Sequence, residues 1–94
     1  MIPIFWTRRA IRERLDALHY LLLRNARAAQ SQSKEISKQV SVLHRFPAIG
    51  RPGEAPGTRE LVIRRTPFHT VYQYRSELPR VEIARLLHNA RHGR

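Results

Sequence analysis

The spacing of hydrophobic residues changes several times along the chain. Residues 2–6 are apolar and rich in β-branched and aromatic side chains, which indicates a short strand; Pro3 limits it to a sheet edge or a strand start. Apolar residues then recur at intervals of four, three and four positions: Ile11, Leu15, Leu18 and Leu22. This spacing marks the buried face of a helix over about residues 8–24. Further apolar residues widen that face: Ala10, Ala17 and Leu21.

Two polar residues are suited to mark helix boundaries. Thr7 can cap the first helix, and Asn25 can end it and cap the next one. A second amphipathic helix is predicted over about residues 27–45 from four apolar residues in helical register: Ala29, Ile36, Val40 and Leu43. The middle of this helix is polar, so we expect only one stripe of it to be buried.

The segment over residues 46–58 contains three prolines and three glycines. Residues of these types favour turns, so we expect a surface loop that is more mobile than the strands it joins. Arg51 could instead tie the loop down through the carboxylate of Glu54 or of Glu60.

The last third of the chain reads as three short strands separated by turns at Pro67 and Pro79. The strands are expected over residues 60–64, 68–74 and 80–88. Short connections between them favour an antiparallel meander. The element order β-α-α-β-β-β therefore predicts an α+β fold, with a helical hairpin packed on one face of an antiparallel sheet. The edge that the first strand joins stays open.

Alternation along the strands divides this sheet into two faces. The helices are expected to cover the more apolar face: Leu61, Ile63, Phe68, Tyr72 and Tyr74. The opposite face is expected to be open and to carry basic and hydrogen-bonding groups: Arg64, His69 and Gln73. The open face is thus a candidate docking surface.

Composition limits the class of protein. With 94 residues, 41% of them hydrophobic, we expect a single domain over residues 1–94 with a mobile C-terminal tail from about residue 89. A disordered chain and a multidomain enzyme are excluded. Cysteine is absent, which excludes a disulfide scaffold and a thiol nucleophile and suits the cytoplasm. No apolar run approaches the length of a membrane-spanning helix.

Charge points to the class of partner. Lys and Arg number 18 and Asp and Glu number 7, so the net charge is +11. Such an excess indicates a nucleic acid or an acidic protein as partner. Basic residues on the first helix are either solvated or bind an acidic segment: Arg8, Arg9, Arg12 and Arg14. His88 and His92 have i,i+4 spacing, but no helix is expected there, so we expect no metal and no cofactor.

Four motifs follow one another in the second half of the chain: Phe46-Pro47 with Gly50-Arg51-Pro52, PGTREL at 56–61, RTPFHTVYQY at 65–74 and LHNAR at 87–91. Together with the Ala-rich helix pair and the element order, they resemble the RelE/ParE superfamily of bacterial toxins, most closely its ParE branch. The resemblance covers most of the chain.

This resemblance implies the toxin of a type II toxin–antitoxin system, a module of plasmid stabilisation. Such a toxin is held inactive by a cognate antitoxin with an acidic amphipathic C-terminal segment. In ParE-like members the target is DNA gyrase, and the toxin acts by binding. RelE-like members instead enter the ribosome and promote cleavage of mRNA.

Individual residues distinguish the two branches. Glu60 and Val62 stand where the RelE-like pattern has two lysines, and His69 stands where it has an arginine. The resemblance therefore favours the ParE branch and binding without hydrolysis. If the chain is a nuclease, histidines could supply general acid–base catalysis, and the candidate catalytic residues are His69, His88 and Arg91, with His92 as a further histidine.

The surface expected to bind the target or the antitoxin comprises mostly cationic side chains: Arg59, Arg64, His69, Gln73, Arg91 and Arg94. A gyrase-binding toxin is the leading hypothesis. The alternatives are a ribosome-dependent mRNA endonuclease and a basic nucleic-acid-binding module without a toxin role.

Overall fold

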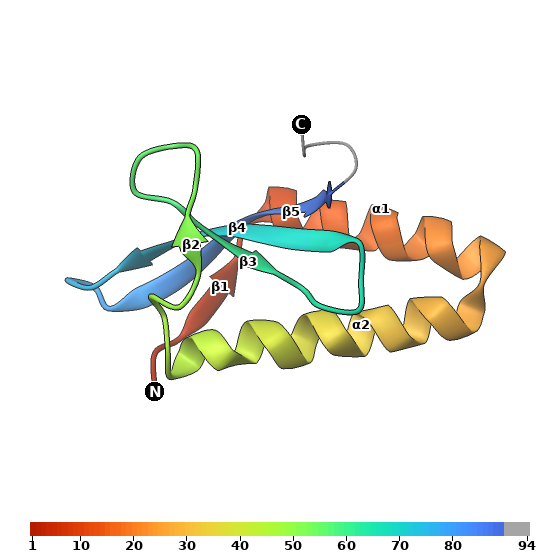
Figure 1. Ribbon diagram of the computed structural model, residues 1–94, viewed down its shortest axis with the longest axis horizontal. Coiled ribbons are helices and arrows are strands. Elements are labelled where there is room, and N and C mark those ends of the chain that lie inside the picture. Colours follow the sequence, from red (N-terminus) through yellow and green to blue (C-terminus); the bar gives the residue numbers. More distant parts are fainter. Residues whose placement is uncertain (90–94) are drawn as a thin grey trace.

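The computed structural model describes residues 1–89. Two helices form a hairpin that lies against a five-stranded sheet (Figure 1). The elements, in chain order, are β1 (Ile4–Trp6), α1 (Arg8–Arg24), α2 (Ala26–Val40), the 3₁₀ helix η1 (Ser41–His44), β2 (Arg51–Pro52), β3 (Arg59–Val62), β4 (Phe68–Arg75) and β5 (Arg80–His88). The α+β class and the helical hairpin are confirmed, and the expected loop contains one additional short strand, β2.

The strand order in the sheet is β1-β5-β4-β3-β2. The strands β2 to β5 are antiparallel, as expected for segments joined by short turns. The first strand instead pairs in parallel with β5, so the sheet is mixed rather than wholly antiparallel. This is possible because the two helices connect β1 to the rest of the sheet by a long crossover.

Local capping explains the helix boundaries. The Thr7 hydroxyl accepts a hydrogen bond from the Ala10 N–H at 3.1 Å, and α1 has the predicted bounds. The Asn25 side chain accepts from the Ala28 N–H at 3.1 Å and begins α2. The second helix ends earlier than predicted, at Val40, because the chain tightens into η1 for its last turn.

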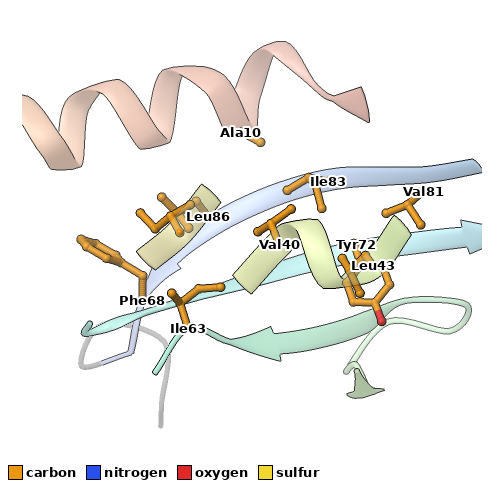
Figure 2. Packing of buried hydrophobic residues seen from close by; sticks show 10 residues of the cluster. Ala10, Val40, Leu43, Ile63, Phe68, Tyr72, Val81, Ile83 and Leu86 are labelled. Atoms are coloured by element: carbon orange, nitrogen blue, oxygen red, sulfur yellow. The ribbon is translucent and has the colours of Figure 1, made fainter. Parts of the chain in front are cut away.

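The hydrophobic core lies between the helical hairpin and one face of the sheet (Figure 2). That face is the predicted one: Ile63, Phe68 and Tyr72 are buried. The other two residues predicted for it, Leu61 and Tyr74, are partly buried and pack against the core. The helices and η1 contribute Ala10, Ile36, Val40 and Leu43, and β5 contributes Val81, Ile83 and Leu86.

The predicted inner face of α1 is correct for Ala10 and Ala17 but wrong for three of the large apolar residues. Ile11, Leu15 and Leu22 are 46%, 60% and 51% exposed, whereas Ala10 is completely buried and Ala17 packs against the core. Small side chains let α1 approach β5 closely, and Ala10 points from the helix toward the core in Figure 2. The larger apolar residues are consequently turned outward, and the described part of the chain does not cover them.

Candidate functional site

The sheet face away from the helices forms a hollow of about 850 Å³. One wall is the segment over residues 51–58, and the floor is formed by β3, β4 and β5. Val62, Val71 and Leu87 make much of the floor apolar, with His69 among them. The face predicted to be open is therefore present, but it is partly walled by a loop and less basic than expected.

His69 lies at the floor of this hollow and is only 8% exposed. Its Nδ1 is 2.7 Å from the side-chain oxygen Oδ1 of Asn89. Because an amide oxygen only accepts hydrogen bonds, Nδ1 is the donor in this contact. Asn89 is held in turn by its backbone N–H, which donates to the Pro67 carbonyl at 2.8 Å.

The structure does not bring His69 and His88 together. In the β4–β5 register Phe68 pairs with His88 and His69 with Leu87, and adjacent pairs point to opposite faces of a sheet. His88 lines a second hollow, of about 640 Å³, between the helical hairpin and the sheet, and it packs edge-on against Phe68 with ring centroids 5.7 Å apart. The other candidates, Arg91, His92 and Arg94, lie outside the described residues.

A bulge in β5 explains why His88 faces the helices. Val71 pairs with Arg85 but Tyr72 pairs with Ile83, so Ala84 is an extra residue in β5. The extra residue reverses which alternate positions point inward. Sequence alternation alone could not reveal this shift.

Arg59 holds the loop instead of presenting a free cation. Its guanidinium donates to the carbonyls of Ala48 and Gly50 at 3.1 and 2.9 Å. Beside it, the buried Tyr72 hydroxyl donates to the Pro47 carbonyl at 2.8 Å and accepts from the Gly50 N–H at 2.9 Å. Burial raises the pKa of Tyr72, so the hydroxyl keeps the proton that it donates.

An ion pair and two further hydrogen bonds hold the rest of the loop. Arg51 forms an ion pair with Glu60 at 3.0 Å, which is one of the two contacts the sequence suggested. The Gly53 N–H donates to the Thr58 carbonyl at 2.8 Å, and the Thr58 hydroxyl donates to the Ala55 carbonyl at 2.6 Å. These contacts fix both ends of the wall beside the hollow.

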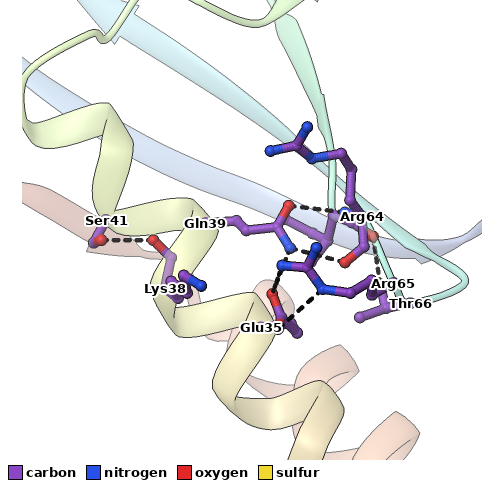
Figure 3. A network of polar contacts seen from close by, with 8 residues as sticks. Glu35, Lys38, Gln39, Ser41, Arg64, Arg65 and Thr66 are labelled. Carbon is purple, nitrogen blue, oxygen red and sulfur yellow. Dashed lines mark hydrogen bonds and ion pairs between the residues drawn. The ribbon is translucent and has the colours of Figure 1, made fainter.

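At the end of β3 the polar contacts run to α2 (Figure 3). The Gln39 side chain accepts from the Arg64 N–H and donates to the Arg64 carbonyl, both at 2.8 Å. Glu35 receives two hydrogen bonds from Arg65, at 2.9 and 3.2 Å, and these bonds and one from Gln39 lower its pKa. The Arg64 side chain is exposed, while Gln73 is half-buried and accepts from Arg75 at 3.3 Å.

A carboxylate on α1 clamps this helix to β5. Glu13 receives hydrogen bonds from the Arg85 Nε at 2.9 Å and from the Leu86 N–H at 3.0 Å. Burial alone would raise the pKa of Glu13, but those bonds and the charges of Arg85 and Arg9 together lower it. The pairing of β1 with β5 ends at Ile83, so the Leu86 N–H lies at a free sheet edge. Glu13 supplies the acceptor for this N–H.

The arginines in the first two turns of α1 differ in their contacts and exposure. Arg14 bridges to α2, donating to the Ser33 carbonyl at 3.2 Å and the Ser37 hydroxyl at 2.7 Å. Arg8 and Arg12 are exposed and flank the outward apolar row. We call Ile11, Leu15 and Leu22 the α1 row. Sequence reasoning found its periodicity but assigned it to the core.

Residues 1–89 contain no group of three or more His, Cys, Asp or Glu residues placed to hold a metal ion. None of their helices is long and apolar enough to cross a membrane.

Comparison with known proteins identifies the family. The model of the "ParE toxin of type II toxin-antitoxin system, parDE" matches residues 4–93. "Putative toxin Y4kP" of Sinorhizobium fredii is 37% identical over 86 residues, covering 90% of this chain and 85% of that protein. The chromosomal ParDE TA system from P. aeruginosa is a structural neighbour with 30% identity and a TM-score of 0.77, covering 94% of this chain and 96% of that chain.

Two more distant structures share the fold. The toxin–antitoxin complex RelBE2 from Mycobacterium tuberculosis has a TM-score of 0.62 at 24% identity, covering 93% of this chain and 96% of that chain. The YoeB/ParE toxin from Agrobacterium tumefaciens has a TM-score of 0.59 at 17% identity, covering 93% of this chain and 98% of that chain. The resemblance noted in the sequence is confirmed: the chain belongs to the ParE family of toxins of type II toxin–antitoxin systems.

Proposed function

We propose that this toxin acts in the cytoplasm by binding DNA gyrase, as part of a plasmid-stabilising module, and not by hydrolysis. The observation that supports binding is the separation of His69 and His88 on opposite sheet faces. A general acid and a general base must both reach one reacting group, and these two side chains do not share a surface. His69 is moreover buried and engaged with Asn89.

The test compares two activities of the wild-type protein. Purified toxin is assayed for inhibition of DNA supercoiling by gyrase and, in parallel, for cleavage of mRNA on ribosomes. We expect inhibition of gyrase and intact mRNA. The double variant His69→Ala, His88→Ala is expected to remain toxic if it stays folded, whereas loss of a catalytic acid or base would lower the rate roughly 10²–10⁴-fold. Cleavage of ribosome-bound mRNA that this variant loses would favour the alternative, an mRNA endonuclease.

We further infer that a cognate antitoxin neutralises the toxin with an acidic amphipathic segment that covers the α1 row. The row is apolar, exposed and flanked by Arg8 and Arg12, which make no ion pair with any residue in 1–89. Apolar anchors bury surface on binding, and the arginines attract an acidic partner. The P. aeruginosa neighbour is a ParDE system and the M. tuberculosis neighbour a toxin–antitoxin complex, which agrees with this inference.

The antitoxin surface can be tested by co-purification with the product of the neighbouring gene. The variant Leu15→Gln, Leu22→Gln should fold normally, because both side chains are more than half exposed. It should bind the antitoxin at least 10-fold more weakly, since losing each buried apolar anchor costs about 1 kcal/mol or more. Leu78→Gln is the matched control, because Leu78 is 53% exposed in the β4–β5 turn. Equal affinity of the double variant and the wild type would contradict the inference.

A further inference from the structure

The outer face of α2 carries a row of three cations. At 100° per residue, Arg27, Lys34 and Lys38 fall within an arc of about 40° and extend over roughly 16 Å of the helix. Ile36, which is completely buried, lies on the opposite side of the helix. Because Ile36 points into the core, the row on the opposite side of α2 points away from the core; in Figure 1 this helix forms the lower margin of the molecule. We call these three residues the α2 row.

The α2 row forms no ion pair with the residues the structure describes, although the charge of Lys38 helps to lower the pKa of the nearby Glu35. All three side chains belong to exposed residues, and none forms an ion pair with any residue in 1–89. The one acidic residue of α2, Glu35, is engaged by Arg65 in two hydrogen bonds and an ion pair at 2.9 Å. A strip of positive charge about three helical turns long is therefore left facing solvent.

Two features of the α2 row oppose the stability of the helix that carries it: the place of Arg27 and the spacing of Lys34 and Lys38. Arg27 lies in the first turn of α2, where a cation is repelled by the positive end of the helix dipole. Lys34 and Lys38 are four residues apart, which places two like charges side by side. Lys38 lies in the last turn, where the helix dipole favours a cation, but local helix stability does not explain Arg27 or the like-charge pair, and a ligand does.

The chemistry between the cations indicates which ligand. Gln30 and Ser31 are exposed, and neither makes a side-chain hydrogen bond with the described residues. The α2 row contains no apolar or aromatic side chain, unlike the α1 row, so a protein partner would find nothing to bury there. Arg, Lys, Ser and Gln are the side chains that contact phosphate oxygens of nucleic acids. Single strands are bound through aromatic stacking, for which this surface offers no ring.

From these observations we propose that the α2 row binds the phosphate backbone of duplex DNA without reading its sequence. Phosphates follow one another every 3.4 Å along the axis of one strand, so a 16 Å row lies beside about five of them. Arg27, Lys34 and Lys38 would each neutralise one phosphate, while Gln30 and Ser31 donate hydrogen bonds between them. This site lies on a different helix from the α1 row and does not depend on the identity of the protein target.

The test measures binding of the isolated toxin to a fluorescein-labelled 20-base-pair DNA duplex by fluorescence anisotropy between 50 and 200 mM NaCl. The variant Arg27→Gln, Lys34→Gln, Lys38→Gln should make the plot of log affinity against log salt concentration shallower by about 2.7, because each contact contributes about 0.9. Over this fourfold change in salt the wild type should lose about 40-fold more affinity than the variant. The variant should also bind more weakly at 50 mM NaCl.

The matched control removes the same amount of charge elsewhere. Arg8→Gln, Arg12→Gln, Arg75→Gln neutralises three exposed arginines outside α2 and should change the salt slope by less than one. Equal effects of the two triple variants would show that only net charge matters and would overturn the proposal. Tighter binding of single-stranded DNA or of duplex RNA of the same sequence would overturn it as well.

Two additional measurements keep these outcomes interpretable. Circular dichroism melting checks that each variant is folded; if the triple variant is not, Arg27→Gln alone and the pair Lys34→Gln, Lys38→Gln should lower the slope by about 0.9 and 1.8. The same variants are assayed for inhibition of gyrase. Inhibition that persists while DNA binding is lost would leave the proposed target intact and support a separate DNA site.

Discussion

Replacing Glu13 tests how α1 is held on the sheet. Glu13→Ala removes the acceptor of the Leu86 N–H and the partner of Arg85, whose Nη2 is 2.7 Å from the carboxylate. Leaving a largely buried N–H unpaired costs about 1–3 kcal/mol. The ion pair adds at most about 1 kcal/mol, because the two side chains are 22% and 27% exposed and solvent screens their charges. We therefore expect a loss of about 2–3 kcal/mol in the free energy of unfolding.

That loss should be visible in thermal unfolding followed by circular dichroism. For a domain of this size, about 1 kcal/mol lowers the Tm by roughly 4–8 °C, so Glu13→Ala should melt about 10–20 °C below the wild type. Glu77→Ala is the control, since Glu77 is exposed, carries the same charge and its side chain forms no hydrogen bond or ion pair with residues 1–89. It should change stability by less than about 0.5 kcal/mol.

The pH dependence gives an independent check. Folding lowers the pKa of Glu13 below its ordinary value of 4.5, so its stabilising contribution is complete above that pH and is lost as the pH falls through the lowered value. The difference in unfolding free energy between the wild type and Glu13→Gln should stay constant from pH 6 to pH 8 and shrink in acid. A difference that grows in acid, or a Glu13→Ala variant as stable as Glu77→Ala, would refute the clamp.

Three further substitutions test the loop and the end of β3. Tyr72→Phe leaves the Gly50 N–H and a backbone carbonyl without their partner and should cost about 2–3 kcal/mol in urea unfolding, against less than about 0.5 kcal/mol for Tyr74→Phe. Gly50→Ala would place a Cβ 2.6 Å from the Tyr72 hydroxyl and should lower the unfolding free energy by about 1–3 kcal/mol. Gln39→Ala removes both hydrogen bonds to the Arg64 backbone and should speed hydrogen exchange of the Arg64 amide at least fivefold, measured by NMR.

The parts of the fold that the sequence predicts correctly depend on local chemistry. Thr7 and Asn25 cap helices through bonds to N–H groups three residues away, so the bounds of α1 follow from the chain itself. The strands β4 and β5 follow from alternation of apolar residues, and both are found within one residue of the prediction.

The incorrect predictions concern residues whose burial depends on segments far away in the sequence. Periodicity shows that Leu15 and Leu22 share a face of α1, but it does not say whether this chain or a partner covers that face. Ala10 takes the inward position because β5 approaches closely, and that distance is set by the whole sheet. The side of β5 on which His88 lies depends on one extra residue in the β4–β5 register, which no alternation rule predicts.

Roles of charged residues were the hardest to predict. Arg59 was expected on the binding surface, yet it donates to the Ala48 and Gly50 carbonyls, whereas the ion pair of Arg51 with Glu60 is one of the two contacts that the sequence suggested. Both partners become neighbours only when the loop folds back on β3. The type of residue was therefore informative about charge but not about whether that charge reaches solvent.

The distribution of acids helps to explain why the outer faces of the two helices carry unpaired cations. Four of the seven acidic residues form ion pairs with arginines, either between elements or along one strand: Glu13, Glu35, Glu60 and Glu82. Each of these carboxylates is thereby unavailable to neutralise the outer faces of the helices. Folding consequently concentrates uncompensated cations on α1 and α2, where the two faces differ in one respect. The α1 row adds apolar side chains to its flanking arginines and suits a protein, whereas the α2 row is polar throughout and suits a phosphate backbone.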